Sequence, residues 1–290
     1  MTDAVEKRVR AALRRVWPDA STVEMAQIRT LGGGLNERSY LIVAGERRQV
    51  LRLPVASSVA WLDVATEARA MRAAASADLA PAVIAVDAEA GLLLTDYRTT
   101  LWAPELVRQP AVVAMIVRLL RALHRLDVDL PVYSIQGFTS SYLAALAGRS
   151  VRALTTEEGR WAVELAQLGR DFDTSHPPTA FCHNDLGAAN ILIDGAAARL
   201  IDFEYAGRGA PLLDLASLAG MNYFTEAQRR LLLEEYYGTA PAPSLRDLDN
   251  AIRMVRLLAY FWGRVAEQRL AAAHAHTKLA DSIGATLRQG

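Results

Sequence analysis

The sequence predicts an α+β fold with two lobes, a small N-terminal lobe built on an antiparallel sheet and a larger C-terminal lobe that is mainly helical. In the first third of the chain, short alternating apolar and polar segments are separated by turn residues, as in β-hairpins. From residue 110 onward, apolar residues recur mostly with the helical period. We therefore divide the chain into residues 1–97 and 98–290, with a hinge expected over residues 96–103.

The smaller lobe is predicted to begin with an amphipathic helix, MTDAVEKRVRAALRRVW, for which Thr2 is a candidate N-cap. Its sheet and its inserted helix follow from the alternation and from the Gly45-Glu46 turn. We predict strands at residues 22–31, 39–44, 48–54, 82–86 and 91–97, and a helix at 59–76.

The larger lobe is predicted to hold helices that are interrupted once by short strands. A strongly apolar helix, AVVAMIVRLLRALHRL, comes first, and the strand segments are TAFC, NILI and ARLIDF. Thr225 and Gln228 have the spacing of a capping box, and Gly238 is the predicted end of that helix. The other helices are expected at residues 141–147, 157–172, 245–273 and 277–287.

The composition excludes several classes of protein. The 290 residues carry no net charge, so there is no electrostatic footprint for nucleic acid. No stretch approaches the roughly 18 apolar residues that a membrane span requires, and the N-terminal segment does not have the pattern of a signal peptide. The single cysteine, Cys182, excludes an intramolecular disulfide. We expect a cytoplasmic globular protein.

Acidic and amide side chains gather in two neighbouring motifs, HNDLGAANILI and LIDFEYAG. Asp185 and Asn190 lie on one loop, and Asp202 ends the next strand. Carboxylate and amide oxygens are the ligands that Mg²⁺ prefers, and a remaining carboxylate can accept a proton from a hydroxyl. The HxDxxxxN spacing is close to the catalytic loop of kinases, although these acids could instead cap turns and strands.

A glycine-rich turn and a basic strand residue complete the predicted phosphate site. LGGGLNERSY precedes a strand, where glycine lets the backbone approach phosphates, although such hairpin turns are common. Arg52 on a following strand could pair with phosphate and with Glu67, which could equally be a solvated helix residue.

These motifs together resemble the choline/ethanolamine kinase family, within the kinase-like group that includes aminoglycoside phosphotransferases and thiamine kinases. GGLNERSYLI, VLRLP, LLRALHRL, HNDLGAANILI and LIDFEYAG occur in the order of that family. The Asn after His183, Arg52 in place of Lys, and the IDFEYAG run favour choline kinases over antibiotic kinases. The chain departs from the family pattern at Val265, where eukaryotic choline kinases carry a second Trp. The Asn that is usual in the glycine loop of the family is also shifted here, with Asn36 and Glu37 near its place.

The resemblance implies a protein-kinase-like fold, ATP and Mg²⁺ as cofactors, and a role for each matching residue. Asp185 is then the catalytic base, Asn190 and Asp202 are the metal ligands, and His183 and Asp214 support the loop. The residues implied at the nucleotide are Gly33, Gly34, Arg52, Glu67, Thr95, Asp96 and Tyr97.

Aromatic and acidic residues of the larger lobe are the candidates for binding a cationic amine, because aromatic faces and carboxylates attract such groups. They are Glu204, Tyr205, Tyr223, Tyr260 and Trp262. Tyr260 and Trp262 lie in an apolar helix and could instead belong to the core. Glu204 could serve either the metal or the substrate.

We therefore predict a kinase that transfers the γ-phosphate of ATP to the hydroxyl of an amino alcohol such as choline or ethanolamine. A thiamine, sugar or aminoglycoside kinase is the alternative within the class, and a non-catalytic nucleotide-binding protein is the alternative outside it. A protein kinase is disfavoured because only about a dozen residues separate Asp202 from Asp214, with no recognisable activation loop.

Overall fold

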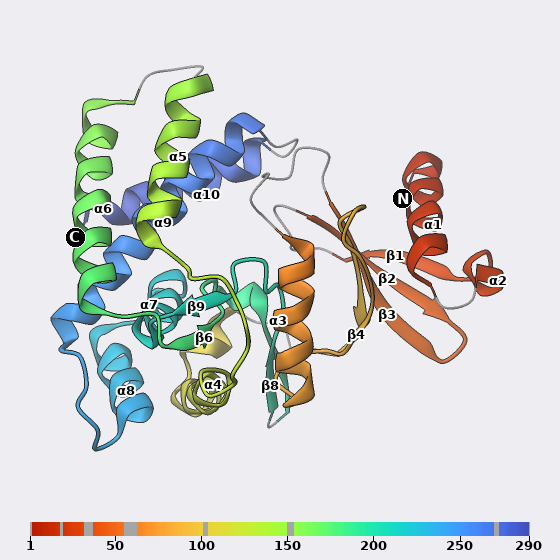
Figure 1. The fold of residues 1–290 in the computed structure, drawn as a ribbon, viewed down its shortest axis with the longest axis horizontal. Helices are drawn as coiled ribbons and strands as arrows, with labels where there is room; N and C mark the ends of the chain where they lie inside the picture. Colours follow the sequence, from red (N-terminus) through yellow and green to blue (C-terminus); the bar gives the residue numbers. More distant parts are fainter. Residues whose placement is uncertain are drawn as a thin grey trace.

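A five-stranded antiparallel sheet forms the N-terminal lobe of this computed structural model (Figure 1). The strand order is β1-β2-β3-β5-β4. The strands are β1 (Gln27–Leu31), β2 (Glu37–Ala44), β3 (Arg47–Pro54), β4 (Val83–Asp87) and β5 (Leu92–Asp96). The structure describes residues 2–17, 20–31, 37–54, 63–100, 104–149, 154–195, 197–269 and 273–289.

Helices cover both faces of this sheet: α1 (Asp3–Val16) lies on one face, with α2 (Ala20–Val23) after it, and α3 (Val64–Ser76) lies on the other (Figure 1). Because side chains alternate along a strand, Leu51 and Leu53 of β3 enter the core beneath α1. Arg52 lies between them and therefore points to the opposite face, where α3 carries Glu67.

The C-terminal lobe is mainly helical, with two small two-stranded sheets, β6-β9 and β7-β8, set among the helices. Its short elements are the 3₁₀ helices η1 (Pro104–Arg108) and η2 (Ala188–Asn190), and the strands β6 (Ala180–Cys182), β7 (Ile191–Asp194), β8 (Ala197–Leu200) and β9 (Gly207–Gly209). Its α-helices are α4 (Pro110–Leu123), α5 (Ile135–Arg149), α6 (Thr156–Ser175), α7 (Pro211–Met221), α8 (Glu226–Tyr237), α9 (Leu245–Arg269) and α10 (Ala273–Leu287). The predicted two-lobed α+β architecture is confirmed.

Helix ends follow the sequence signals closely. The capping box before α8 is present, with Thr225 accepting from the main-chain N–H of Gln228, and Gly238 ends the helix at φ 58°. Thr2 occupies the N-cap position of α1 as predicted, although its side chain makes no capping hydrogen bond.

Hydrogen bonds tie the β7-β8 hairpin to the N-terminal lobe and to Thr100, which follows that lobe in the chain. Thr100 Oγ1 accepts from the N–H of Ile193 (3.0 Å), and the N–H of Leu200 donates to the oxygen of Leu79 (2.8 Å). β5 ends at Asp96, and the division at residue 97 stays a prediction; residues 101–103 of the expected hinge lie outside the described residues. Among the helices in the described part of the chain, none combines the length and apolarity of a bilayer-crossing segment.

Candidate active site

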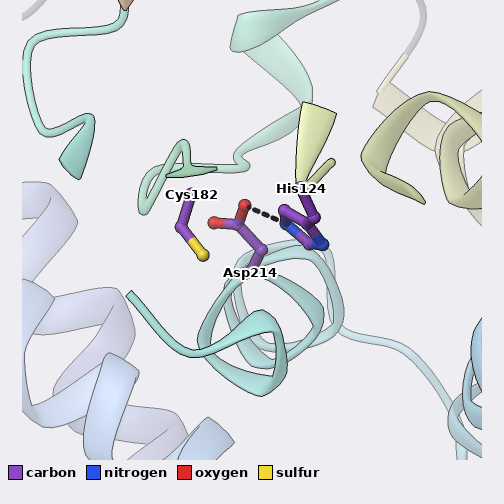
Figure 2. Close-up of side chains that lie close together, drawn as sticks. All are labelled: His124, Cys182 and Asp214. Atoms are coloured by element: carbon purple, nitrogen blue, oxygen red, sulfur yellow. Dashed lines mark hydrogen bonds and ion pairs between the residues drawn. The ribbon is translucent and has the colours of Figure 1, made fainter. Parts of the chain in front are cut away.

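The loop after β6 is held by one buried carboxylate, that of Asp214 in the first turn of α7. Its Oδ2 accepts from the main-chain N–H of His183 (2.9 Å), and its Oδ1 accepts from that of Asn184 (2.7 Å). His124 at the end of α4 donates from Nε2 to the same Oδ2 (2.9 Å; Figure 2). Burial alone would raise the pKa of Asp214, but the bonds from His124 and His183 outweigh it and hold that pKa below its usual value. Asp214 is therefore an ionised anchor for the loop.

Among the described His, Cys, Asp and Glu residues, three lie close enough together to hold a metal ion: His124, Cys182 and Asp214, with one ligand atom from each within 4.8 Å of the others (Figure 2). Burial raises the pKa of the Cys182 thiol well above its usual value, whereas a metal ligand would need to be a thiolate. Since Asp214 already accepts three N–H groups, the cluster fits a structural role better than a metal site.

His183 fixes the geometry of the loop through both ring nitrogens. Its Nδ1 accepts from the main-chain N–H of Asp185 (3.3 Å), which leaves Nε2 to donate to the main-chain oxygen of Ile201 (2.9 Å). Because one ring nitrogen accepts and the other donates, this arrangement fits a neutral imidazole. His183 thus connects the loop of Asp185 to the end of β8, just before Asp202.

Asp185 and Asn190 face each other across the loop. The Asn190 Nδ2 donates to the main-chain oxygen of Asp185 (3.0 Å) and to its Oδ2 (2.9 Å). Both amide protons are used in this way, so Oδ1 of Asn190 is the atom that can accept a cation. Burial, together with the nearby charge of Asp202, raises the pKa of Asp185 to about 6. A carboxyl group with a pKa in this range suits proton abstraction near neutral pH.

Asp202 follows β8 with φ 67°, in the left-handed region that Asn and Asp tolerate best among residues with a side chain. Its Oδ1 accepts from the Nη1 of Arg52 (2.6 Å), and the Nη2 of Arg52 donates to Glu67. The exposed fraction of the Glu67 side chain is 3%, and burial raises its pKa while Arg52 opposes that rise. Sequence reasoning paired Arg52 with Glu67; it did not anticipate the bond to Asp202.

A single cavity of about 960 Å³ brings these groups together, with Arg52, Asp185, Asn190 and Asp202 all in its lining. The donor set at Asn190 and Asp202 is one amide oxygen and one carboxylate at neighbouring strand ends, which fits a hard cation such as Mg²⁺.

The end of the cavity next to the sheet is lined by Thr95, Asp96, Tyr97 and Arg98. The N–H groups of Asp96 and Tyr97 already donate to Ala82 (2.9 Å) and Arg48 (3.0 Å), so they are not available to a nucleobase. The glycines predicted at the phosphates, Gly33 and Gly34, lie outside the described residues, as does Asn36.

Aromatic residues near a carboxylate line a part of the cavity that belongs to the C-terminal lobe, which we call the aromatic end. Glu204, Tyr205 and Trp262 are among the residues predicted there, and all three line the cavity. Tyr133 and Tyr142 join them, and sequence reasoning missed both. Burial raises the pKa of Tyr142 and Tyr205, and the charges of Glu204 and Asp185 add to that effect. These tyrosines therefore lie close to both carboxylates.

Two other predicted aromatic residues lie outside the cavity lining. Tyr260 is buried, and its hydroxyl donates to Glu158 (2.7 Å) inside the core. Tyr223 is 46% exposed, with the guanidinium of Arg256 over its ring. The structure therefore gives Tyr260 a place in the core and Tyr223 a place on the surface.

The curated proteins that are similar to the chain in sequence include the following two. LicA of Haemophilus influenzae is 27% identical over 251 residues, which cover 82% of this chain and 73% of LicA. Ethanolamine kinase 2 of Mus musculus is 27% identical over 184 residues, which cover 55% of this chain and 47% of that enzyme. The chain thus spans about half the length of the mouse relative.

Solved structures with the same fold include a choline/ethanolamine kinase family protein from Mesorhizobium loti. It has a TM-score of 0.78 and 26% identity, and the match covers 98% of this chain and 93% of that protein. The choline kinase LicA from Streptococcus pneumoniae has a TM-score of 0.79 at 16% identity, and the match covers 99% of this chain and 100% of that protein. At this identity the likeness shows the fold alone. The sequence profile of the phosphotransferase enzyme family matches residues 27–244, well over half of the chain, and the chain therefore belongs to that family.

Proposed function

We propose that this protein is an ATP-dependent kinase that transfers the γ-phosphate to the hydroxyl of an amino alcohol such as choline or ethanolamine. The observation that carries the proposal is the shared cavity, which joins Asp185, Asn190 and Asp202 to an aromatic end near Glu204. Membership of the phosphotransferase family supports the reaction class, and the names of the relatives support the acceptor class. The cytoplasm remains the location that we expect.

Asp185 acts in this proposal on the acceptor hydroxyl, which it orients and from which it takes the proton. Its pKa of about 6 supports this role, as does its place beside Asn190. Arg52 serves the phosphates, and Glu67 and Asp202 hold its guanidinium in place. Asn190 and Asp202 are the residues that would hold Mg²⁺, which when bound neutralises charge on the phosphates.

The aromatic end of the cavity supports a cationic acceptor. Tyr133, Tyr142 and Tyr205 surround this region, and Glu204 supplies a negative charge there. A substituted ammonium group is attracted by aromatic faces and by a carboxylate at once. This combination favours an amino alcohol over an uncharged sugar.

The proposal is tested by incubating the protein with Mg·ATP and one hydroxyl compound at a time: choline, ethanolamine, thiamine, a hexose and an aminoglycoside. The phosphate ester is detected by mass. We expect the amino alcohols to be phosphorylated first. Preferred phosphorylation of the hexose would instead assign a sugar kinase, and nucleotide binding without any product would assign a non-catalytic binding protein.

Replacement of the proposed base is the sharper test. We expect Asp185→Ala to reduce kcat by a factor of roughly 100 to 10,000, the range that general-base catalysis contributes. Nucleotide affinity, measured by calorimetry, should change little because Asp185 faces the acceptor. Turnover at the wild-type rate in this variant would remove Asp185 from the mechanism.

A further inference from the structure

Three helices of the C-terminal lobe, α7, α9 and α10, line the cavity mostly with apolar side chains. From α9 it receives Val255, Leu258, Ala259 and Trp262, which have the i, i+3, i+4, i+7 spacing of one helix face. From α10, which packs along α9 (Figure 1), it receives Leu279. None of the described residues that line the cavity from α7, α9 or α10 carries a charge.

α7 completes this wall with Leu213, Ser217 and Met221, which also lie on one helix face. The hydroxyl oxygen of Ser217 accepts from the main-chain N–H of Leu186 (2.9 Å), so Ser217 is not counted in the apolar surface. We call the surface made by Leu213, Met221, Val255, Leu258, Ala259, Trp262 and Leu279 the apolar wall.

The apolar wall holds seven apolar side chains from three helices, whereas choline offers only three methyl groups and ethanolamine none to pack against them. In the proposed function, the acceptor hydroxyl lies at Asp185 and its ammonium group lies near Glu204 and the tyrosines. These groups fix the head of the acceptor, so only a further substituent of the nitrogen can cover the wall. Burying apolar surface against apolar surface is favourable in proportion to the area removed from water.

We propose that the preferred acceptor is an amphiphilic amino alcohol, whose nitrogen carries an apolar chain or an aromatic ring that lies against the apolar wall. This inference rests on the proposed function and narrows its substrate class. The chemical class is a hydroxylated amine with a hydrocarbon substituent larger than the methyl groups of choline.

A series of N-alkyl-N,N-dimethylethanolammonium ions tests the inference. The alkyl substituent is methyl (choline), ethyl, propyl, butyl or benzyl. The kcat/KM of the wild-type protein is measured for each by ADP release. We expect kcat/KM to rise roughly fourfold per added methylene, the factor that ~0.8 kcal/mol per buried CH₂ gives at 25 °C.

Filling the apolar wall should remove this gain. Ala259→Phe places a large ring on the wall, and we expect the ratio of kcat/KM for the butyl compound to that for choline to fall to about 1. Ala275→Phe is the matched control, because Ala275 is an exposed residue of α10 outside the cavity lining. The ratio should stay at the wild-type value in the control.

The outcomes separate the two proposals. Equal or falling kcat/KM from choline to butyl, with choline phosphorylated, overturns the amphiphilic acceptor and leaves the amino alcohol kinase in place. A rising series that Ala259→Phe does not affect overturns the assignment to the apolar wall. If no member of the series is phosphorylated, both proposals fall.

Discussion

Arg52 bridges two carboxylates that are far apart in the chain. Its two terminal nitrogens bond separately to Glu67 and to Asp202, which lies 150 residues away in sequence. A lysine ammonium is a single point of charge, whereas the planar guanidinium presents a fork of donors that can serve two acids at once. Arginine at this position therefore positions a predicted metal ligand, Asp202, while it also pairs with Glu67.

The buried pair of Arg52 and Glu67 allows a prediction about the stability of the protein. Arg52→Met leaves Glu67 without its cation, and breaking a buried pair from one side costs about 3–5 kcal/mol. We expect the free energy of unfolding, measured in urea, to fall by about that amount. In the double variant Arg52→Met/Glu67→Met most of the loss should return, because the buried charge of Glu67 is gone and Asp202, whose side chain is 32% exposed, can be solvated by water. A double variant as unstable as the single one would show that the cost lies in packing instead.

The sequence predicted some residues of the site and could not decide the place of others. Asp185, Asn190 and Asp202 were identified because they lie in short motifs with fixed spacing, and the structure brings them to one cavity. Tyr260 and Trp262 could not be separated by sequence, since both lie on one apolar helix two positions apart. Tyr260 faces the core and Trp262 the cavity, and only the packing of α9 decides between them.

At the scale of elements, strand β9 brings an aromatic residue to the cavity from another part of the chain. The N–H of Arg208 donates to the oxygen of Pro131 (2.8 Å), and that of Tyr133 donates back to the oxygen of Arg208 (2.9 Å). Gly207 permits this approach, because a Cβ there would lie 2.8 Å from the oxygen of Pro131 and 3.4 Å from Cβ of Tyr133.

Gly207→Ala should therefore displace Tyr133 from the cavity. We expect the KM of the acceptor to rise roughly tenfold to a hundredfold, since small misplacements of binding groups have effects of that size. The KM of ATP should change much less. Gly148→Ala is the control, because Gly148 lies on α5, which also carries Tyr142, and has nothing within 4 Å of an added Cβ. Equal increases in both KM values would point to a general distortion.

Elements differed in how well the sequence predicted them, for a physical reason. The strands of the N-terminal sheet were predicted from the alternation of apolar and polar residues, and the start of α8 from its capping box. Both signals can be recognised within a few residues. α7 was missed because every residue from Leu212 to Gly220 is buried, so the helix has no polar face to give a period. Tyr133 was missed because it reaches the site through the contact with β9, which no local pattern reveals.

At the scale of the molecule, the cavity is shared by the two lobes, from Val50 and Leu93 in the sheet to Leu279 in α10. A ligand that occupies it touches both lobes and is bound only while both are folded. Binding therefore adds to the free energy of unfolding of the whole protein.

This linkage predicts the effect of removing the metal. At a concentration near 100 times its Kd, Mg·ATP adds about 2.7 kcal/mol. We expect the melting temperature to rise by about 5 °C, because each kcal/mol shifts it by about 2–4 °C in proteins of 150–250 residues and the lower end of that range applies to this longer chain of 290 residues. EDTA should remove the part of the shift that depends on Mg²⁺, and Asp202→Ala should remove the same part without EDTA. A shift that EDTA leaves intact would contradict a metal-dependent nucleotide site.

The carboxylate of Asp214, which anchors the loop of His183 and Asn184, comes later in the chain than the groups that it binds. The carboxylate that accepts the N–H groups of His183 and Asn184 is added 31 and 30 residues after them, and its partner His124 precedes it by 90 residues. A nascent chain that has passed Asp185 but has not yet released α7 from the ribosome has no acceptor for these groups. The proposed base is therefore translated before the carboxylate that fixes the position of its loop.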